Sequence, residues 1–484
     1  MWTQFISLSC LALQVQARPP SWGNKGDHSS HDDEGLVIET TSGQLHGFIN
    51  ESTPDVRQWL GVPYAEPPLG HLRFSAAEAK KAEPGLIYTR DWQPSCMQQW
   101  GNSSSVYTEV VLQFLTYGSN SEDCLYLNIW APAASKSKEK LPVYVYIPGG
   151  GFTSGGAHSW YKVPDQLVQA RQDAVFVIMN VEWTRDNIAA FGGDPERINL
   201  WGQSAGGASV DIYSYAWHED PIVTGFSADS GTVGIAGRGS GSDSSNFTYL
   251  AGLVGCGNLS ASAELNCMRN VPAGTLENTL SAYLVSDAEP SISFSPVVDD
   301  VLVFSDYAER AASGQVAQAP MIIGNNNNEG AGFVPFSQEG PGEEALQQAD
   351  LRISCGIPPE LSNREAAGLT TYRYIYSGNF SNVSPLPWMG AYHSSELPII
   401  FGTHYEYRGN STPFEWEVAH TMQDLWLSFA ADKSKAPHAQ LEDGSTFSWP
   451  AYSDSKSSTV EFASGDEVTS LVSGESPGDQ ECPS

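Results

Sequence analysis

The chain has 484 residues, of which 40% are hydrophobic and 17% charged. This balance is typical of a globular protein and excludes a disordered chain. It carries 56 Asp and Glu against 24 Lys and Arg, a formal net charge of −32. Such a charge repels nucleic acid and anionic membranes, so we expect neither as a partner. No stretch approaches the roughly 18 unbroken apolar residues that a membrane-spanning helix needs.

Residues 1–17 are typical of a secretory signal peptide. Phe5 to Leu13 is an apolar core, and Val15-Gln16-Ala17 is a small-residue cleavage pattern, although no Lys or Arg precedes the core. An ordinary buried N-terminal segment is the alternative. Residues 18–35 form a polar leader, whose two histidines among acidic residues indicate a solvated tail rather than a metal site. We expect a secreted, extracellular protein with no metal and no cofactor.

Cysteine usage agrees with secretion. Without the signal peptide an even number of cysteines remains, which in an exported chain indicates disulfides. They are Cys96, Cys124, Cys256, Cys267, Cys355 and Cys482. Spacing favours the local pairs Cys96–Cys124 and Cys256–Cys267 without fixing them, while Cys355 and Cys482 either pair or stay free. Asn-x-Ser/Thr sequons, compatible with a glycosylated surface, stand at Asn50, Asn102, Asn246, Asn258, Asn379, Asn382 and Asn410.

The main domain is expected to run from 36 to 463. It begins with a hairpin pattern at 36–48, followed by a Pro-rich loop at 61–68 that cannot be helical. Between Cys96 and Cys124 lies an apolar run, 106–117, with helical periodicity. This run is either a lid over a hydrophobic pocket or a helix packed on the core.

Strands alternate with helices from residue 125 onwards. Strand patterns cover 125–130, 143–147 and 174–179, and helix patterns cover 161–172 and 181–191. This alternation of almost wholly apolar strands with helices predicts an α/β fold in one large domain, with a mostly parallel sheet covered by helices on both faces. The acidic, Ser/Gly-rich tail, 464–484, is expected to be loose except where Cys482 anchors it.

The stretch Asn199–Val210 reads as a buried strand, a sharp turn and the start of a helix. Its turn carries Gly202-x-Ser204-x-Gly206, the spacing of a nucleophile elbow. A serine at such a turn has a strained backbone, and glycines two residues away on each side give it room. The elbow exposes the serine hydroxyl, and the N–H of Ala205 at the helix start can face a developing negative charge.

A serine hydroxyl needs a base within hydrogen-bond reach and an acid to orient that base. In α/β-hydrolases these residues follow in the order Ser, acid, His. His393 is the favoured base because it lies in a loop after the strand pattern 372–376, and His404 is the second choice. His420 falls in a helical pattern and His438 in a Lys/Pro/Ala loop, so both fit the role less well.

The acid and the anion-binding groups are expected at the ends of earlier strands. Glu329 lies in the polar turn after the strand pattern 319–324, with a solvated loop carboxylate as the alternative. Gly149-Gly150-Gly151 follows the strand 143–147, and three glycines let backbone N–H groups approach a ligand oxygen closely. With Ala205 they predict an oxyanion hole, in which removing one donor costs ~3–4 kcal/mol. The turn lacks the Lys and Ser/Thr of a phosphate-binding loop.

Several of these motifs resemble the type-B carboxylesterase/lipase family, which includes the cholinesterases, and look most like its fungal secreted members. The motifs lie at 61–74, 122–132, 148–152, 191–209 and 390–398. The resemblance implies an α/β-hydrolase fold. It also implies a triad of Ser204, Glu329 and His393, oxyanion donors at Gly150, Gly151 and Ala205, and the disulfides Cys96–Cys124 and Cys256–Cys267.

The sequence departs from this family in three places. Pro148 replaces a His common before the glycines, a mild change because the donors are backbone groups. At Asn180/Val181 roughly two dozen residues of a strand-to-helix crossover appear absent, although residues 181–197 still exceed the dozen that a parallel crossover needs. The interval from Glu329 to His393 is also short. We therefore expect a fold that is incomplete at the 180/181 junction, with part of the sheet uncovered.

The sequence predicts a secreted serine hydrolase that cleaves a small-molecule or lipid carboxylic ester through an acyl-enzyme on Ser204. One alternative is a non-catalytic binding homologue like the cholinesterase-like adhesion proteins. A second is an inactive, truncated gene product lacking residues around 180/181.

Overall fold

The computed structural model describes residues 35–98, 104–133, 139–235, 245–286, 288–454, 456–473 and 482. The expected signal peptide, the polar leader apart from Gly35, and the sequon at Asn102 lie outside these ranges. Within them, no helix is both long enough and apolar enough to cross a lipid bilayer.

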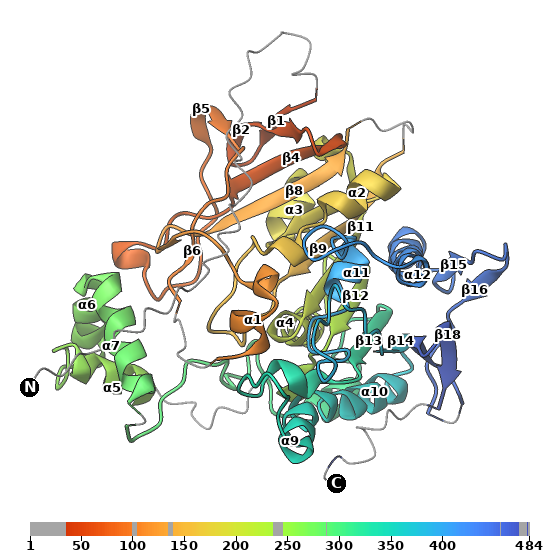
Figure 1. Cartoon of the computed structure of the whole chain (residues 1–484). Coiled ribbons are helices and arrows are strands. Elements are labelled where there is room, and N and C mark those ends of the chain that lie inside the picture. Colours follow the sequence, from red (N-terminus) through yellow and green to blue (C-terminus); the bar gives the residue numbers. More distant parts are fainter. Residues whose placement is uncertain are drawn as a thin grey trace, which may run out of the picture. The chain divides into compact units, whose positions relative to one another are not determined.

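An eleven-stranded sheet organises the domain (Figure 1). Its strands in spatial order are β18 (Glu467–Val472), β17 (Thr459–Ser464), β14 (Thr371–Tyr376), β13 (Met321–Asn326), β12 (Gly225–Asp229), β11 (Gly193–Gln203), β9 (Leu141–Ile147), β10 (Val175–Ile178), β8 (Tyr126–Pro132), β4 (Thr53–Pro63) and β3 (Phe48–Asn50). The strands from β17 to β10 are parallel, and antiparallel strands extend the sheet at both edges. The predicted mostly parallel α/β sheet is confirmed.

Smaller strands and the helices surround this sheet. The smaller strands are β1 (Val37–Thr40), β2 (Gly43–His46), β5 (Glu83–Tyr88), β6 (Ser95–Cys96), β7 (Asn120–Ser121), β15 (His438–Gln440) and β16 (Thr446–Ser448). The helices are α1 (Val106–Glu109), α2 (Asp165–Arg171), α3 (Val181–Asn187), α4 (Ala205–Ala216), α5 (Ser245–Leu253), α6 (Ala261–Asn270), α7 (Ala273–Val285), α8 (Tyr307–Ala312), α9 (Glu343–Ser354), α10 (Ile357–Ala366), α11 (Leu397–Phe401) and α12 (Pro413–Ala431).

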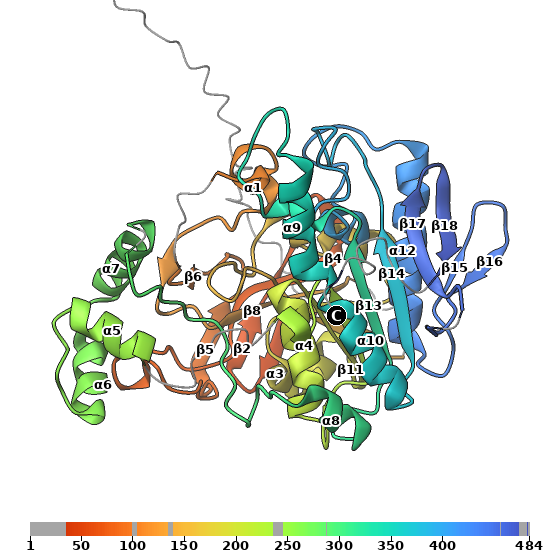
Figure 2. The same cartoon turned by 90° about the horizontal axis from the view of Figure 1, so that it is seen from below.

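Two hydrophobic cores lie on the two faces of the sheet. Along β9, Tyr144 and Tyr146 belong to one core and Val143 and Val145 to the other, because successive side chains of a strand point to opposite faces. Residues of α2, α11 and α12 fill the first core, and residues of α3, α4 and α10 fill the second. Figure 2 shows α4 and α10 on one side of β13 and β14 and α12 on the other. Burial on both faces explains why the strands are apolar throughout.

The 180/181 junction closes without a break in the sheet. The connection from β10 to β11 passes over β9 and turns at Met179 and Asn180, which both have positive φ angles (81° and 66°). Asn180 caps α3 by accepting a hydrogen bond from the Trp183 N–H at 2.8 Å. The Trp183 indole is buried and donates to the Ser42 hydroxyl at 2.8 Å. The shortened crossover therefore still covers the sheet, at the expense of two successive strained residues.

Two local expectations need correction. The run 106–117 is not one helix: it consists of α1 and a short 3₁₀ turn at Leu112–Phe114, which contribute Val106, Val111 and Phe114 to the core. The tail beyond 463 is not loose throughout, since β18 pairs with β17 along its length. The hydrogen-bonded pairing with β17 makes this segment an edge strand rather than a loose tail.

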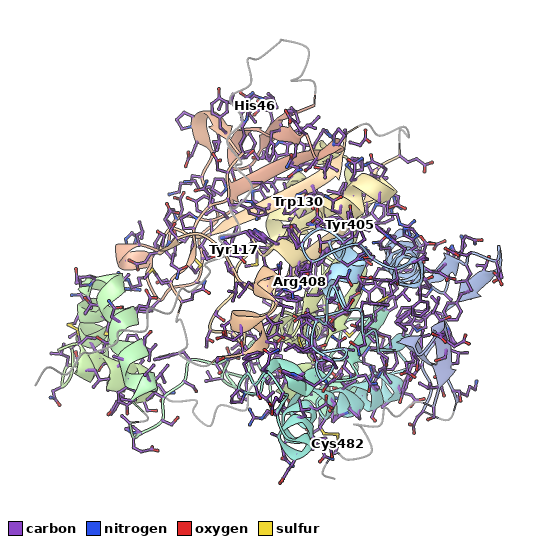
Figure 3. All side chains as sticks on the ribbon, viewed as in Figure 1. His46, Tyr117, Trp130, Tyr405, Arg408 and Cys482 are labelled. Atoms are coloured by element: carbon purple, nitrogen blue, oxygen red, sulfur yellow. A yellow bond between two sulfur atoms is a disulfide. The ribbon has the colours of Figure 1, made fainter. Side chains whose placement is uncertain are left out.

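Three disulfides fix distant loops. Cys96–Cys124 and Cys256–Cys267 form as expected, and Cys355 pairs with Cys482, the pairing that spacing had left open. The last bridge, labelled at Cys482 in Figure 3, joins residues 127 positions apart and ties the chain's end to the segment between α9 and α10. Closing so long a loop removes much conformational entropy from the unfolded chain.

Candidate active site

Ser204 lies at the tight turn between β11 and α4, as the sequence predicts. Its backbone has φ 60° and ψ −127°, a strained conformation for a residue with a side chain. The turn requires glycine on both sides, because a Cβ at Gly202 would collide with the Gly206 carbonyl and one at Gly206 with the Ile147 carbonyl. The Ser204 N–H donates to the Asp229 carbonyl at 2.8 Å, which holds the turn against β12.

Glu329 is fully buried after β13, at the start of a 3₁₀ turn. One carboxylate oxygen accepts hydrogen bonds from the Ser230 hydroxyl at 2.6 Å and from the Asn326 N–H at 2.7 Å. The other lies 2.5 Å from Nδ1 of His393. All three contacts fix the carboxylate in one orientation, and a carboxylate can only accept, so Nδ1 of His393 carries the proton.

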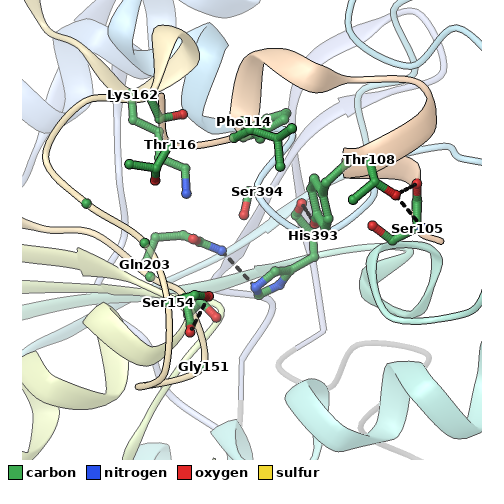
Figure 4. Close-up of a pocket in the computed structure, with 18 of the residues that line it drawn as sticks. Ser105, Thr108, Phe114, Thr116, Gly151, Ser154, Lys162, Gln203, His393 and Ser394 are labelled. Atoms are coloured by element: carbon green, nitrogen blue, oxygen red, sulfur yellow. Dashed lines mark hydrogen bonds between the residues drawn. The ribbon is translucent and has the colours of Figure 1, made fainter. Parts of the chain in front are cut away.

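Protonation at Nδ1 leaves the second ring nitrogen of His393, Nε2, as an acceptor. In the structure this nitrogen lies 3.1 Å from Nε2 of the Gln203 amide, as the dashed line in Figure 4 shows. The Ser204 hydroxyl makes no hydrogen bond to any described residue, so His393 and Ser204 face one cavity without a hydrogen bond between them. The amide of Gln203, one residue before the serine, occupies the acceptor that a serine hydroxyl would use.

The glycine turn after β9 lies against the serine. A Cβ at Gly149 would come within 2.7 Å of the Ser204 Cβ, and Gly150 and Gly151 have φ angles of 150° and 62°. The Gly150 carbonyl accepts from Thr153 and Ser154, which closes the turn. The N–H groups of Gly150 and Gly151 have no acceptor in the described part of the chain. They are available to an oxygen bound beside Ser204, as is the N–H of Ala205 in the first turn of α4.

These groups line one cavity of about 450 Å³. Its floor is Ser204, the glycine turn and His393, and Tyr107, Phe114 and Phe333 form apolar walls. The Phe333 ring lies 4.5 Å from the His393 ring, and the Tyr107 hydroxyl donates to the His393 carbonyl at 2.6 Å. The 106–117 segment therefore packs on the core and also borders the cavity.

A group of buried acids lies behind the cavity. Burial raises the pKa of Asp229 to about 7, an effect opposed by the hydrogen bond that it accepts from the Trp201 indole. Burial and the charge of Glu329 raise the pKa of Asp350 to about 7. Burial, with Asp229 and Glu329 nearby, raises the pKa of Glu396 well above its ordinary value. Clusters of acids with shifted pKa values are typical of functional sites.

The other three histidines that we considered as the base lie outside the cavity. His404 is buried beside Glu415, with its Nδ1 3.1 Å from that carboxylate, and does not border the cavity. His420 is on α12, and His438 is exposed on β15 rather than in a loop. The structure thus brings Glu329, His393, Ser204 and the glycine turn together and leaves these histidines out.

Sequence reasoning missed three residues of the site. Gln203 stands beside the serine in the elbow, Ser230 follows β12, and Lys162 ends the 3₁₀ turn that precedes α2. Only Gln203 has a signal in the sequence, its place next to the predicted nucleophile. Ser230 and Lys162 reach the site through tertiary packing alone.

Comparisons with known proteins agree on one family. The model of the carboxylesterase family matches residues 34–181, 177–353 and 348–475. The matched ranges meet at 177–181, which includes the 180/181 junction, and at 348–353, between Glu329 and His393.

Named relatives cover almost the whole chain. A chlorogenic acid esterase of Aspergillus niger is 49% identical over 478 residues, covering 91% of this chain and 92% of that protein. Secreted lipase 5 of Gibberella zeae is 35% identical over 537 residues, covering 98% and 97%. A cholinesterase of Mus musculus is 26% identical over 511 residues, covering 87% and 82%.

Proposed function

The chain belongs to the carboxylesterase family and is a carboxylic ester hydrolase, and we propose that it works through an acyl-enzyme formed on Ser204. In this mechanism His393 is the general base, Glu329 orients it, and the N–H groups of Gly150, Gly151 and Ala205 bind the oxyanion. The observation that carries the proposal is the 2.5 Å contact between Glu329 and His393 Nδ1, which leaves Nε2 as a proton acceptor facing the cavity of Ser204.

The first half of the reaction acylates the serine. The Gln203 amide moves away from Nε2 of His393, and the Ser204 hydroxyl replaces it as the hydrogen-bond partner of this nitrogen. Nε2 then accepts the hydroxyl proton as Oγ bonds to the ester carbonyl carbon. The carbonyl electron pair moves onto its oxygen, which the backbone N–H groups hold. When the pair returns, the bond to the alcohol oxygen breaks, and His393 gives its proton to the departing alcohol.

The second half releases the acid. Water replaces the alcohol, loses a proton to His393 Nε2 and attacks the acyl carbon. The same N–H groups hold the second oxyanion. Its collapse breaks the bond to Oγ, His393 returns the proton to Ser204, and the carboxylic acid leaves. The Glu329 carboxylate stabilises the imidazolium in both halves and keeps the productive tautomer between them.

Secretion is part of the proposal. The signal-like pattern of residues 1–17, the three disulfides and the relative named a secreted lipase support it. The substrate is a small-molecule or lipid ester, and the similarity to a chlorogenic acid esterase makes chlorogenic acid the first ester to test. The two alternatives, a non-catalytic binding homologue and an inactive truncated product, are not favoured, because the named relatives are hydrolases and the sheet is continuous across the 180/181 junction.

Active-site labelling tests the proposed nucleophile. A fluorophosphonate probe should label the folded protein stoichiometrically, and peptide mapping should place the label on Ser204 rather than on Ser154 or Ser394 of the same cavity. A 4-nitrophenyl ester should give a burst of nitrophenol, because the acyl-enzyme accumulates. The Ser204→Ala variant should lose both signals. Ser209→Ala, one turn along α4 and outside the cavity lining, should keep them. Labelling at another residue would reject the mechanism.

A further inference from the structure

Lys162 brings a positive charge into the cavity that the ester reaction does not use. It ends the 3₁₀ turn Trp160–Lys162 and lines the cavity together with Ser204, His393 and the glycine turn. Figure 4 shows its side chain reaching into the cavity, with the nitrogen directed to the space above Gln203. The side chain is partly buried, and the surface that it keeps exposed faces this cavity.

The ammonium group of Lys162 has no hydrogen-bond or ion-pair partner among the described residues. The Phe114 ring lies near the ammonium group, with its centroid 5.8 Å from Nζ. Lys80 pairs with Glu83 at 2.7 Å and Lys435 with Asp432 at 2.8 Å, so other lysines of this acidic chain do find carboxylates. An enclosed charge without a partner is unfavourable, and a ligand of opposite charge relieves that cost.

The groups around Lys162 do not neutralise it. The carboxyl whose charge acts on Lys162 is that of Glu396, at the start of α11. The Glu396 side chain is buried and accepts a hydrogen bond from Asn326. Burial, with Asp229 and Glu329 nearby, raises the pKa of Glu396 well above its ordinary value, and Glu396 makes no hydrogen bond or ion pair with Lys162 in the described part of the chain. The residues Leu112–Phe114 packed against the turn carry no charge. Arg408, whose charge acts on Tyr161 of the same turn, is a second cation and donates to the Val110 carbonyl.

Lys162 stays charged at neutral pH. Burial lowers its pKa to about 8, an effect opposed by the attraction of Glu396. The ammonium form therefore predominates below pH 8 and is lost as the pH rises above it. The chain as a whole, with a formal net charge of −32, repels anions, so Lys162 supplies a local attraction that the overall charge does not.

We propose that Lys162 binds a free carboxylate of the substrate, so that this hydrolase prefers esters that also carry a carboxylate. The inference rests on the proposed function, because it takes Ser204 as the point of attack. In this arrangement the ester carbonyl lies over Ser204 and the glycine turn, and the carboxylate lies against Lys162. The connecting carbon chain or ring packs on Phe114 and Leu115, which also line the cavity.

Matched ester pairs test this preference from both sides of the scissile bond. For the acyl side, 4-nitrophenyl hydrogen glutarate is compared with methyl 4-nitrophenyl glutarate. For the alcohol side, 3-acetoxybenzoate is compared with 3-acetoxybenzamide. The wild type should favour the anionic member of at least one pair in kcat/KM. Lys162→Met should reduce kcat/KM for that anionic ester about 10- to 100-fold, the value of a charge-assisted hydrogen bond, and leave the neutral ester within a few fold.

Two further variants separate the effect of a positive charge at residue 162 from the effect of the protein's net charge. Lys162→Arg keeps the positive charge and should retain most of the preference. Lys435→Met removes the same charge from the exposed surface and should change neither ester, which controls for the net charge. In the wild type the preference should also weaken as the pH rises through about 8, where Lys162 loses its proton. Lys162→Met should not show this weakening.

A binding measurement keeps the inference separate from the mechanism. Benzoate, which carries no ester, should bind the wild type and bind Lys162→Met at least tenfold more weakly by calorimetry. An unchanged ester ratio and unchanged benzoate affinity in Lys162→Met would overturn the role of Lys162 while leaving ester hydrolysis intact. Absence of any ester hydrolysis or Ser204 labelling in the wild type would overturn the proposed function instead, and the benzoate result would still decide whether Lys162 binds carboxylates.

Discussion

The described residues include two buried pairs of a histidine and a glutamate, and the pairs differ in what lies on the far side of the histidine ring. His393 contacts Glu329 at 2.5 Å, and His404 contacts Glu415 at 3.1 Å, in both cases through Nδ1. Beyond His393, Nε2 faces the cavity that holds Ser204. Beyond His404, Nε2 is buried without a hydrogen-bond partner in the described residues, and the ring packs on Trp416 at 4.6 Å.

The difference teaches that a histidine held by a carboxylate is not by itself a catalytic unit. The Glu415 pair belongs to a helix start: Glu415 forms the capping box of α12 with Thr412 and accepts a second bond from Asn382 at 2.8 Å. The Glu329 pair belongs to the ends of β13 and the loop after β14, where parallel strands expose their carboxyl ends. The pair of His404 and Glu415 therefore lies at the start of a helix, whereas the pair of His393 and Glu329 is accessible from the cavity.

Replacing the two histidines gives the largest contrast. His393→Gln should lower kcat about 10⁶-fold, because the serine loses its base. His404→Gln should leave kcat unchanged and lower the free energy of unfolding by about 1–3 kcal/mol, since a buried hydrogen bond to a carboxylate is weakened. Ester hydrolysis and denaturant unfolding of both variants measure this. A folded His404→Gln protein without activity would reverse the assignment.

Replacing the two glutamates gives the next largest contrast. Glu329→Gln should lower kcat about 10⁴-fold, because an amide that donates to Nδ1 moves the proton to Nε2 and removes the acceptor. Glu415→Gln should keep its kcat and lose about 1 kcal/mol of stability, since the cap of α12 is weakened. Thermal melts beside steady-state kinetics distinguish the two. Equal kcat losses in both variants would show that the pairs do not differ as we describe.

A tyrosine near each histidine offers a smaller test. The Tyr107 hydroxyl donates to the His393 carbonyl, and Tyr405 packs beside His404 and donates to Gln166. Tyr107→Phe should lower kcat up to about tenfold, since one positioning hydrogen bond contributes about 1 kcal/mol. Tyr405→Phe is the matched control and should keep kcat. The result would count against a positioning role if KM alone changed in Tyr107→Phe.

Asp229 and Asp350, whose pKa values are raised, give the smallest expected effect, a fall in the free energy of unfolding as the pH rises. Asp229 and Asp350 have pKa values of about 7 in the folded chain, above those of exposed carboxyls. Between about pH 4 and 7 the folded state therefore holds protons that the unfolded state has lost, so stability falls as the pH rises through this range. The melting temperature should be higher at pH 5 than at pH 8.

Removing one of these acids should flatten that slope. Asp350→Asn deletes a titrating group and should narrow the difference between pH 5 and pH 8. Asp432→Asn is the matched control: hydrogen bonds from Lys435 and Ser434 lower the pKa of Asp432, so this carboxyl is ionised in both the folded and the unfolded state between pH 5 and pH 8, and its removal should leave the slope unchanged. An unchanged slope in Asp350→Asn would show that its carboxyl does not titrate differently on folding.

Much of the fold could be predicted from the sequence because its strands and helices have local signals. The strand patterns 143–147, 174–179 and 372–376 correspond to β9, β10 and β14 in the structure, and the alternation with helices predicted the parallel sheet. The tail was predicted less well. Its strand β18 is short and mostly not buried, so its identity depends on pairing with β17 rather than on its own composition.

For the site, the sequence by itself determined the elbow, since Gly202 and Gly206 meet a steric need that acts over a few residues. Chain order and the strand ends pointed to Glu329 and His393, which lie in contact in the structure. Only the tertiary structure decided that Nε2 of His393 faces Gln203, that Lys162 enters the cavity and that Cys355 meets Cys482. These contacts join residues far apart in sequence, and the register and packing of the sheet, not local pattern, bring them together.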